Sequence, residues 1–435
     1  MLNNDHESFA AAQARAAAAV SCESVVLPSG LTVLCRTMPG YSSVHAIYAT
    51  GFGSVHRAFR LDGKQVTLPA GTAHFLEHKM FDTKDGNALQ DLAANGASPN
   101  AFTSTAITGY YFESTEKFEE NLKILLSFVS VPWFTKESVD KEQGIIGQEI
   151  RMIEDDPENQ VFYGMLEALY EHNPVRVSIA GTVESIAEIT AETLYACHAA
   201  FYNPGNMTLC VAGNVDPRRV CEIAREVLPK EGLRDIPRDY GGEEPEQAFR
   251  PETVQEMAVS TPIFQLGWKA DPAPLGEEHM RRQFIGELCC EAVFGTSTPL
   301  YASLYSRGLV NNNFSYGYEA YPGCAMLTVG GESRDPWALR EAIAAEAARI
   351  GREGIGQELW DRLKKAAYGG RVRALNSFEN ICVGLAQSHF TGEEFFRFPE
   401  VFEGISKSDV EDCVRRWMSP ERTALSVVKP KGEKV

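Results

Sequence analysis

Apolar and polar residues alternate along several short stretches in the first part of the chain, a period of two that is typical of strands burying one face. A Pro-Ser-Gly sequence interrupts the first stretch and predicts a hairpin there. The segments expected to form strands are 25–34 (the hairpin), 44–50, 98–105 and 108–114.

Longer segments between and after these strands have the pattern of helices. Helices are expected around His74 and over residues 87–94, 117–130, 136–154, 160–171 and 184–201. Strands that follow one another directly, with helices gathered around them, indicate an α+β fold with an antiparallel sheet.

The two halves of the chain end in the same pattern. In each half a helix ends at an aromatic residue, proline follows three positions later, and the next strand carries Leu and Val five and seven positions after that proline. The matching positions are Phe201 and Trp417, Pro204 and Pro420, Leu209 and Leu425, and Val211 and Val427. Such repetition indicates duplication, so we expect two homologous domains, each an antiparallel sheet packed with helices.

A segment rich in proline, glycine and charged residues separates the two halves. This composition is typical of a connection between domains. We therefore expect a first domain over residues 1–230, a linker over 231–252 and a second domain over 253–435.

The sequence His-Phe-Leu-Glu-His, which begins at His74, is the one place where two histidines stand four apart around a glutamate. On a helix, His74 and His78 lie one turn apart on one face with Glu77 beside them. The intervening Phe75 and Leu76 then turn toward the core. Packed or solvated histidines are the alternative, but the added glutamate favours a zinc site of the H-x-x-E-H type with its own general base.

A catalytic zinc ion normally has three protein ligands and one open position, so two histidines leave one ligand to be found. Glu142 and Glu149 are seven residues apart and share one face of the helix expected over 136–154. One could bind the metal and the other could support a ligand. A solvated acidic face is the alternative, since the chain has 59 acidic residues, and the spacing leaves both open.

Composition narrows the possible partners and location. The formal net charge of -18 disfavours binding to nucleic acid and to anionic membranes, because both require basic patches. No apolar run reaches the ~20 residues that cross a bilayer. The 10 cysteines form no C-x-x-C pair and suit a reducing compartment. The first residues lack the basic start of a signal peptide, so we expect a cytoplasmic protein.

Four motifs follow in order along the first half of the chain. They are the sequence around the two histidines (71–81), an Asn-Ala-x-Thr-Ser segment (100–104), a Glu-x6-Glu pair (142–149) and a Phe-Tyr-x-Pro-x-Asn sequence (201–206). Together they resemble the M16 (pitrilysin/insulinase) family of zinc peptidases. The details are most similar to the bacterial YmfH-type branch, whose members are usually encoded beside a second, zinc-less M16 protein.

This resemblance implies a zinc endopeptidase that hydrolyses short or unfolded peptides. It assigns one zinc ion per chain to His74, His78 and Glu149, the general base to Glu77 and support of the metal site to Glu142.

The resemblance also implies where a peptide substrate binds. It would be added as a strand along Asn100, Ala101 and Phe102, where backbone hydrogen bonds give affinity with little demand on sequence. An ordinary polar strand edge is the alternative for this segment.

The second half departs from the family pattern. Family members generally carry Arg and, seven residues later, Tyr around an Arg-Gly-Leu-like turn, where both bind the substrate carbonyl. Here the turn is 307–309, but the two positions hold Leu304 and Asn311, with Tyr316 or Tyr318 as substitutes under another register. We therefore expect a zinc-less M16 partner subunit to complete the site in a heterodimer. A homodimer remains the alternative.

A function of a different class is also compatible with the resemblance. The chain could be a zinc-bearing assembly or binding subunit of a modification pathway, such as that of elongation factor P, with little proteolysis. The general base argues against this alternative, because a scaffold has no need of one.

Overall fold

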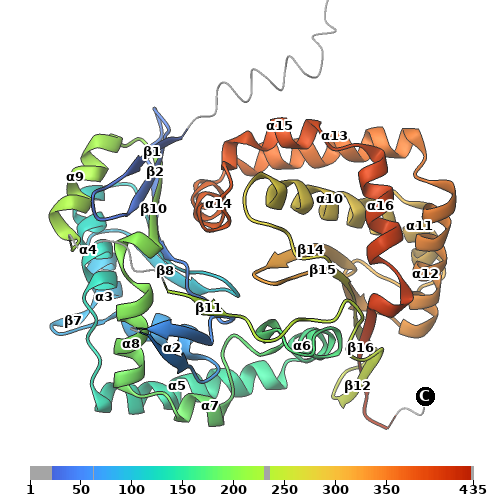
Figure 1. Cartoon of the computed structure of the whole chain (residues 1–435), viewed down its shortest axis with the longest axis horizontal. Coiled ribbons are helices and arrows are strands. Elements are labelled where there is room, and N and C mark those ends of the chain that lie inside the picture. The colour runs from blue at the N-terminus through green and yellow to red at the C-terminus, as the bar shows by residue number, and fades with distance from the viewer. Residues whose placement is uncertain (1–21, 62, 230–235, 433–435) are drawn as a thin grey trace, which may run out of the picture.

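The computed structural model describes residues 22–61, 63–229 and 236–432. Figure 1 shows two halves side by side, each a sheet with helices around it, the first blue to green and the second yellow to red. The first residues of the chain, which suggested that there is no signal peptide, lie outside the described ranges. Residues 231–235 of the expected linker also lie outside them. Within those ranges, no helix combines the length and the apolar character that crossing a bilayer requires.

The first half is built on a six-stranded sheet with the order β1-β2-β10-β3-β9-β8. β2 and β10 run parallel, and all other neighbouring strands are antiparallel. The predicted hairpin and the three further strands are confirmed, within a few residues of their expected bounds. The strands are β1 (Glu23–Val26), β2 (Thr32–Thr37), β3 (Val44–Thr50), β8 (Ser98–Thr103), β9 (Thr108–Ser114) and β10 (Met207–Gly213).

Helices cover one face of this sheet. The prediction of a single helix over 184–201 is wrong. Two helices form there, because Thr182 and Thr190 each cap the start of a separate helix with a side-chain oxygen. The helices are α2 (Thr72–Met80), α3 (Ala88–Ala94), α4 (Phe118–Ser130), α5 (Lys136–Asp155), α7 (Val183–Ala187), α8 (Ala191–Phe201) and α9 (Pro217–Val227).

Short strands outside the main sheet have no clear period in the sequence and were not expected. β11, which lies in the expected linker, pairs with β4, so this part of the linker is attached to the first half. These strands are β4 (Ala58–Leu61), β5 (Lys64–Thr67), β6 (Asp82–Thr83), β7 (Gly86–Asn87) and β11 (Arg238–Asp239).

The second half repeats the topology of the first. Its five-stranded sheet has the order β12-β16-β13-β15-β14, with β12 and β16 parallel and the other pairs antiparallel. This order matches β2-β10-β3-β9-β8. Both halves also contain the succession helix, 3-10 turn and strand, as α8 to β10 in the first and α16 to β16 in the second, so the predicted duplication is confirmed. The strands are β12 (Glu252–Met257), β13 (Ile263–Ala270), β14 (Ser315–Tyr321), β15 (Cys324–Glu332) and β16 (Thr423–Pro430).

Helices of the second half enclose a separate core on their sheet. They are α10 (Glu277–Phe294), α11 (Pro299–Ser306), α12 (Pro336–Glu353), α13 (Gln357–Ala374), α15 (Phe398–Glu403) and α16 (Lys407–Trp417).

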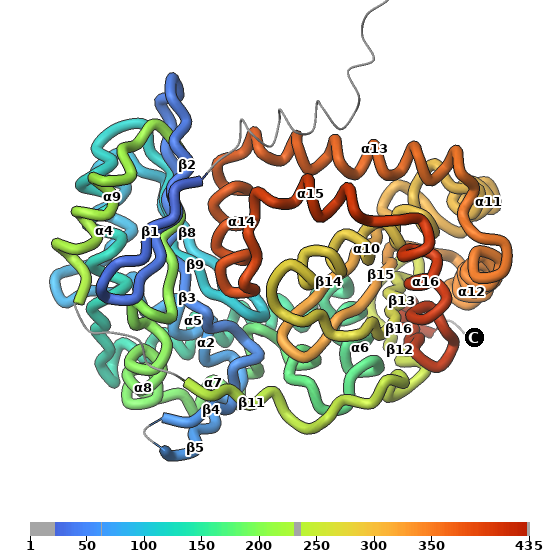
Figure 2. Tube along the Cα trace, turned by 45° about the horizontal axis from the view of Figure 1, so that its top comes forward, coloured from blue at the N-terminus to red at the C-terminus, as the bar shows by residue number. Residues whose placement is uncertain are grey.

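One helix from each half packs on the sheet of the other half. α6 (Pro157–Leu169) lies against β13 and β16, while α14 (Phe378–Thr391) lies against β3 and β10 (Figures 1 and 2). Each contact has its own cluster of fully buried apolar side chains. Separating the two halves would expose both apolar clusters to water. The exchange of α6 and α14 therefore stabilises the contact between the halves.

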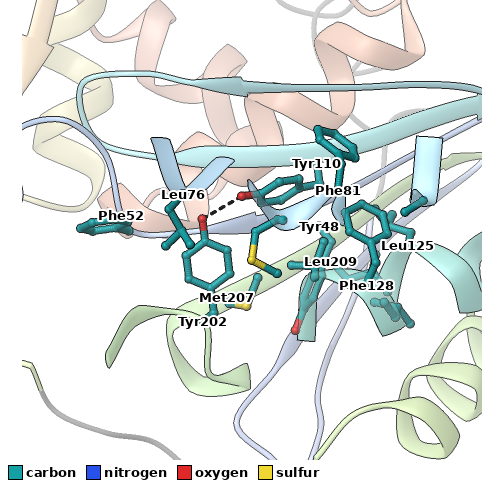
Figure 3. Close-up of a cluster of buried hydrophobic side chains, with 14 of the residues drawn as sticks. Tyr48, Phe52, Leu76, Phe81, Tyr110, Leu125, Phe128, Tyr202, Met207 and Leu209 are labelled. Carbon is teal, nitrogen blue, oxygen red and sulfur yellow. Dashed lines mark hydrogen bonds between the residues drawn. The ribbon is translucent and has the colours of Figure 1, made fainter. Parts of the chain in front are cut away.

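The core of the first half lies directly beneath α2. Leu76 of α2 is fully buried among aromatic side chains that include Phe52, Tyr110 and Tyr202 (Figure 3). The Tyr110 and Tyr202 hydroxyl groups hydrogen-bond each other at 2.8 Å, which satisfies two polar atoms inside this core. The face of α2 that carries Leu76 is therefore fixed on the sheet.

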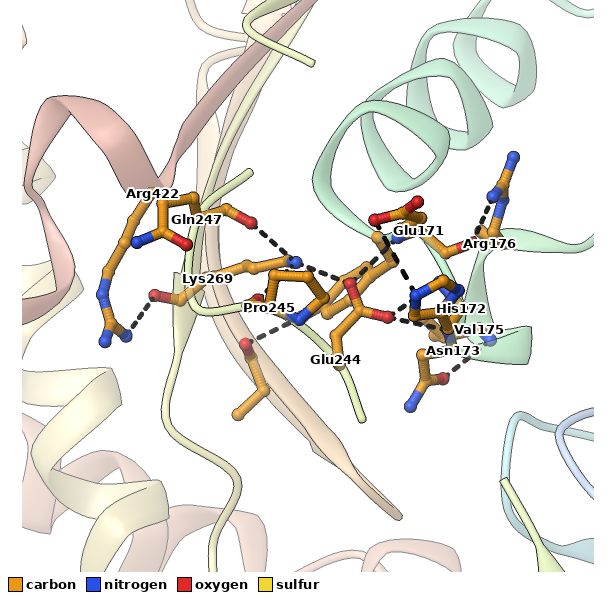
Figure 4. A network of polar contacts seen from close by, with 12 residues as sticks. Glu171, His172, Asn173, Val175, Arg176, Glu244, Pro245, Gln247, Lys269 and Arg422 are labelled. Carbon is orange, nitrogen blue, oxygen red and sulfur yellow. Dashed lines mark hydrogen bonds and ion pairs between the residues drawn. The ribbon is translucent and has the colours of Figure 1, made fainter. Parts of the chain in front are cut away.

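A buried ion pair joins the connecting segment to both halves (Figure 4). Glu244 accepts the backbone N–H groups of residues 171–173, just after α6, at 2.8 to 2.9 Å. It also pairs at 2.6 Å with Lys269 of β13, whose side chain is only 4% exposed. Lys269 donates to two carbonyl oxygens of the connecting segment as well.

Replacing Lys269 with Met is expected to lower the free energy of unfolding by about 3–5 kcal/mol, because it leaves the Glu244 charge without its partner. Urea denaturation of the whole chain measures this change. Lys136→Met is the matched control, since it removes an ion pair to Asp140 whose two side chains are 87% and 54% exposed. Its expected cost is under about 1 kcal/mol. Equal losses in the two variants would contradict the role given to Lys269.

Candidate metal centre

The first turn of α2 is held against a neighbouring loop by glycine. Gly71 precedes the helix with a φ of 88°, a left-handed conformation that glycine adopts without strain. A Cβ atom at this position would lie 2.4 Å from the Ala180 carbonyl oxygen, so no larger residue fits. Phe75 and Leu76 are fully buried, as predicted, and this orients His74 and His78 away from the core.

The structure brings His74, His78 and Glu149 together from two helices. His74 Nε2 lies 3.5 Å from Glu149 Oε1, and His78 Nε2 lies 3.6 Å from Glu149 Oε2. One potential ligand atom from each of the three residues lies within 4.8 Å of the others. Glu149 of α5 therefore lies beside both histidines and is not simply part of a solvated acidic face.

The separation of these atoms fits a zinc ion. Bonds of ~2.0–2.2 Å from nitrogen and oxygen to a tetrahedral zinc ion place neighbouring ligand atoms roughly 3.3–3.5 Å apart. The two nitrogen-to-oxygen distances are close to this value, at 3.5 Å from His74 to Oε1 and 3.6 Å from His78 to Oε2, so each imidazole faces a different oxygen of the same carboxylate. Two imidazoles and one carboxylate are also a known donor set of catalytic zinc sites.

Glu142 lies behind His78. Its Oε1 is 3.1 Å from His78 Nδ1, so the imidazole can donate its Nδ1 proton to this carboxylate and keep a lone pair on Nε2. Burial lowers the pKa of His78, but the hydrogen bond to Glu142 and the nearby carboxylates outweigh it, and the net shift is upward. Burial, with the nearby His78, lowers the pKa of His74 to about 4.

Glu77 lies beside the two histidines and is only 8% exposed. Burial raises its pKa, which makes the carboxylate a stronger base than an exposed glutamate. Thr103 Oγ1 donates a hydrogen bond to Glu77 Oε2 at 2.9 Å. No role was expected for Thr103 from the sequence, although it stands in the Asn-Ala-x-Thr-Ser motif and is one strand position beyond Phe102.

The three residues expected to bind substrate lie in β8, the edge strand of the first sheet. Ala101 is paired with the buried Tyr110 and faces α2. Asn100 and Phe102 lie on the opposite face, where Phe102 packs in the cluster beneath α14. An added peptide strand would therefore meet the backbone of all three residues but only one of their side chains on the metal side.

Four residues stand at, or could replace, the Arg and Tyr of the family pattern. All four make contacts within the second half. Leu304 is fully buried, and Asn311 donates a hydrogen bond to Glu332 at 2.7 Å. The ring of Tyr318 stacks on Trp417 in the core. Tyr316 packs among neighbouring aromatic rings of the same half.

Comparison with known proteins identifies the family. Residues 67–183 match the model described as insulinase (peptidase family M16), and residues 188–367 match the one described as peptidase M16 inactive domain. The uncharacterised zinc protease YmfH of Bacillus subtilis is 38% identical over 411 residues, which cover 93% of this chain and 96% of that protein. The chain belongs to the M16 family.

Further M16 proteins agree with this assignment. An uncharacterised zinc protease of Mycobacterium tuberculosis is 31% identical over 440 residues, covering 96% of this chain and 95% of that protein. The crystal structure of an M16-like peptidase from Alicyclobacillus acidocaldarius has a TM-score of 0.91 and 32% identity, covering 95% of this chain and 99% of that one. The predicted α+β fold of two M16 domains is confirmed.

The position of Glu142 behind His78 in the candidate metal centre leads to a testable prediction. Glu142→Ala is expected to weaken zinc binding by about 10- to 100-fold, because His78 loses the carboxylate that orients its ring. Competition with a chelator measures the zinc affinity. Glu137→Ala is the control, since Glu137 is an exposed residue in the first turn of the same helix. An unchanged affinity in Glu142→Ala would contradict this role.

Proposed function

We propose that the chain is the catalytic subunit of a zinc metallopeptidase that cleaves short or unfolded peptides. The observation that supports this most is the convergence of His74, His78 and Glu149 with a buried glutamate, Glu77, beside them. In this proposal residues 1–230 form the catalytic domain, 231–252 the linker and 253–435 a domain that shapes the substrate chamber.

The chemistry follows from the positions of these residues. A zinc ion held by His74, His78 and Glu149 would supply Lewis acidity, which makes water a nucleophile near neutral pH. Glu77 accepts a proton from the attacking water while the water oxygen bonds to the scissile carbonyl carbon. The same carboxyl group then delivers that proton to the leaving nitrogen as the C–N bond breaks.

The outer edge of β8 is the proposed binding place for extended peptides. In this proposal the substrate pairs with the backbone of Asn100, Ala101 and Phe102 as an added strand. Among the residues that the structure describes, β8 pairs with β9 alone, and its other edge could take such a strand. Because α2 packs beside β8, a peptide bound there would run close to Glu77.

A partner subunit is part of the proposal. Stabilising the oxyanion of the tetrahedral intermediate requires a donor, and such a donor is often worth ~2.7–4 kcal/mol. Leu304 and Asn311 stand where the family pattern has Arg and Tyr, and both are engaged within the second half. We therefore propose that a zinc-less M16 chain supplies this donor in a heterodimer, within the cytoplasm.

The partner proposal is tested with a quenched unstructured peptide. The purified zinc-loaded chain is assayed alone and after mixing with the proposed zinc-less M16 partner, and cleavage is expected only in the mixture. Cleavage by the lone chain would contradict the heterodimer and favour a homodimer. No cleavage in either preparation, despite one bound zinc ion per chain, would favour an assembly subunit of a modification pathway.

A further inference from the structure

Thr103 connects the edge strand to the candidate general base. Its Oγ1 donates to Glu77 Oε2 at 2.9 Å, in a part-buried contact between β8 and α2. Glu77 itself is buried, so this hydrogen bond is shielded from competing water. A bond from a neutral hydroxyl to a charged carboxylate is among the stronger hydrogen bonds in proteins.

The strand fixes the direction of the Thr103 side chain. Side chains alternate between the faces of β8, and Thr103 lies on the same face as Ala101, toward α2. Its partner across the sheet is Thr108, which is fully buried and donates to the Phe52 carbonyl oxygen at 2.8 Å. The Thr108 hydroxyl also lies 3.4 Å from Thr103 Oγ1, but its single proton is donated to Phe52, so it limits the space behind Thr103 without anchoring it.

The contact leaves the two oxygens of the Glu77 carboxylate in different roles. Oε2 accepts the Thr103 proton, and Oε1 remains for the proton of the attacking water. Without such a contact, the carboxylate of a glutamate rotates over a broad range of its terminal torsion angle. The hydroxyl therefore selects one orientation of the base.

We propose that Thr103 is a positioning residue that aligns Glu77 with a peptide bound along β8. This inference rests on the proposed function, since it assigns a role within that reaction. One short strand would carry both the substrate-binding edge, at 100–102, and the hydroxyl that orients the base. Substrate register and base orientation would thus be set by the same element.

Two substitutions at Thr103 test this role. Thr103→Val keeps the shape of the side chain and removes the hydroxyl, and is expected to lower kcat by about tenfold to a hundredfold with KM unchanged. Thr103→Ser restores the donor and is expected to recover most of kcat. Thr37→Val is the matched control, because it removes a part-buried hydroxyl from β2 of the same sheet. It should leave kcat and KM unchanged.

A second readout does not depend on activity. In crystal structures of the metal-free variants, Glu77 should leave its wild-type orientation in Thr103→Val and keep it in Thr103→Ser. An unchanged kcat in Thr103→Val, or a higher KM with kcat unchanged, would overturn the inference while leaving the proposed function intact. If the wild-type mixture cleaves no peptide, the proposed function fails and the inference fails with it.

Discussion

Glu77→Gln is expected to reduce peptide hydrolysis by about 10²- to 10⁴-fold, the usual contribution of general acid-base catalysis. Gln has nearly the same shape but cannot accept the proton of the attacking water. Zinc should stay bound, because Glu77 is not among the three residues whose ligand atoms converge. Initial rates with a quenched peptide, together with zinc content measured on the same samples, separate the two effects.

The control for this variant is Glu116→Gln, which makes the same chemical change at an exposed position. Its rate and zinc content should equal those of the wild type. Full activity in Glu77→Gln would show that another group accepts the proton. Loss of zinc from Glu77→Gln would instead mean that Glu77 holds the metal.

Glu149→Ala is expected to abolish zinc binding and hydrolysis together. The side chain of Glu149 lies between the two imidazoles, at 3.5 and 3.6 Å from their Nε2 atoms. Removing it takes away one of the three proposed ligands, so the loss of affinity should exceed the about 10- to 100-fold expected for a residue that only supports a ligand. Elemental analysis after dialysis measures the bound zinc.

Glu154→Ala is the matched control, since Glu154 is exposed on the same helix, five positions after Glu149. It should retain one zinc ion per chain. Stoichiometric zinc in Glu149→Ala would contradict the ligand assignment. It would favour Glu142, the other carboxylate of the pair, as the third ligand.

The elements around the metal centre could be predicted because their signals are local. Helical spacing places His74 and His78 on one face, and Phe75 and Leu76 on the other, without reference to distant residues. The spacing of Glu142 and Glu149 allowed either carboxylate to be a ligand. Only the packing of α5 against α2 brings Glu149 between the imidazoles and Glu142 behind one of them.

Other features depend on contacts far apart in the sequence. The exchange of α6 and α14 could not be predicted, because an apolar helix face does not reveal which sheet it covers. The hydrogen bond from Thr103 to Glu77 joins a strand to a helix across 26 positions. The break between α7 and α8 did have a local signal, Thr190, whose side chain caps the second helix.

The most direct test of the central claim is whether cleavage depends on zinc. The chain is mixed with the proposed zinc-less M16 partner, and the rate of peptide cleavage is measured before chelation, after chelation, and after zinc is restored. We predict that cleavage is lost with the metal and returns when one zinc ion per chain has been bound. Cleavage that survives complete removal of zinc, or fully zinc-loaded protein that cleaves no peptide, would contradict the account.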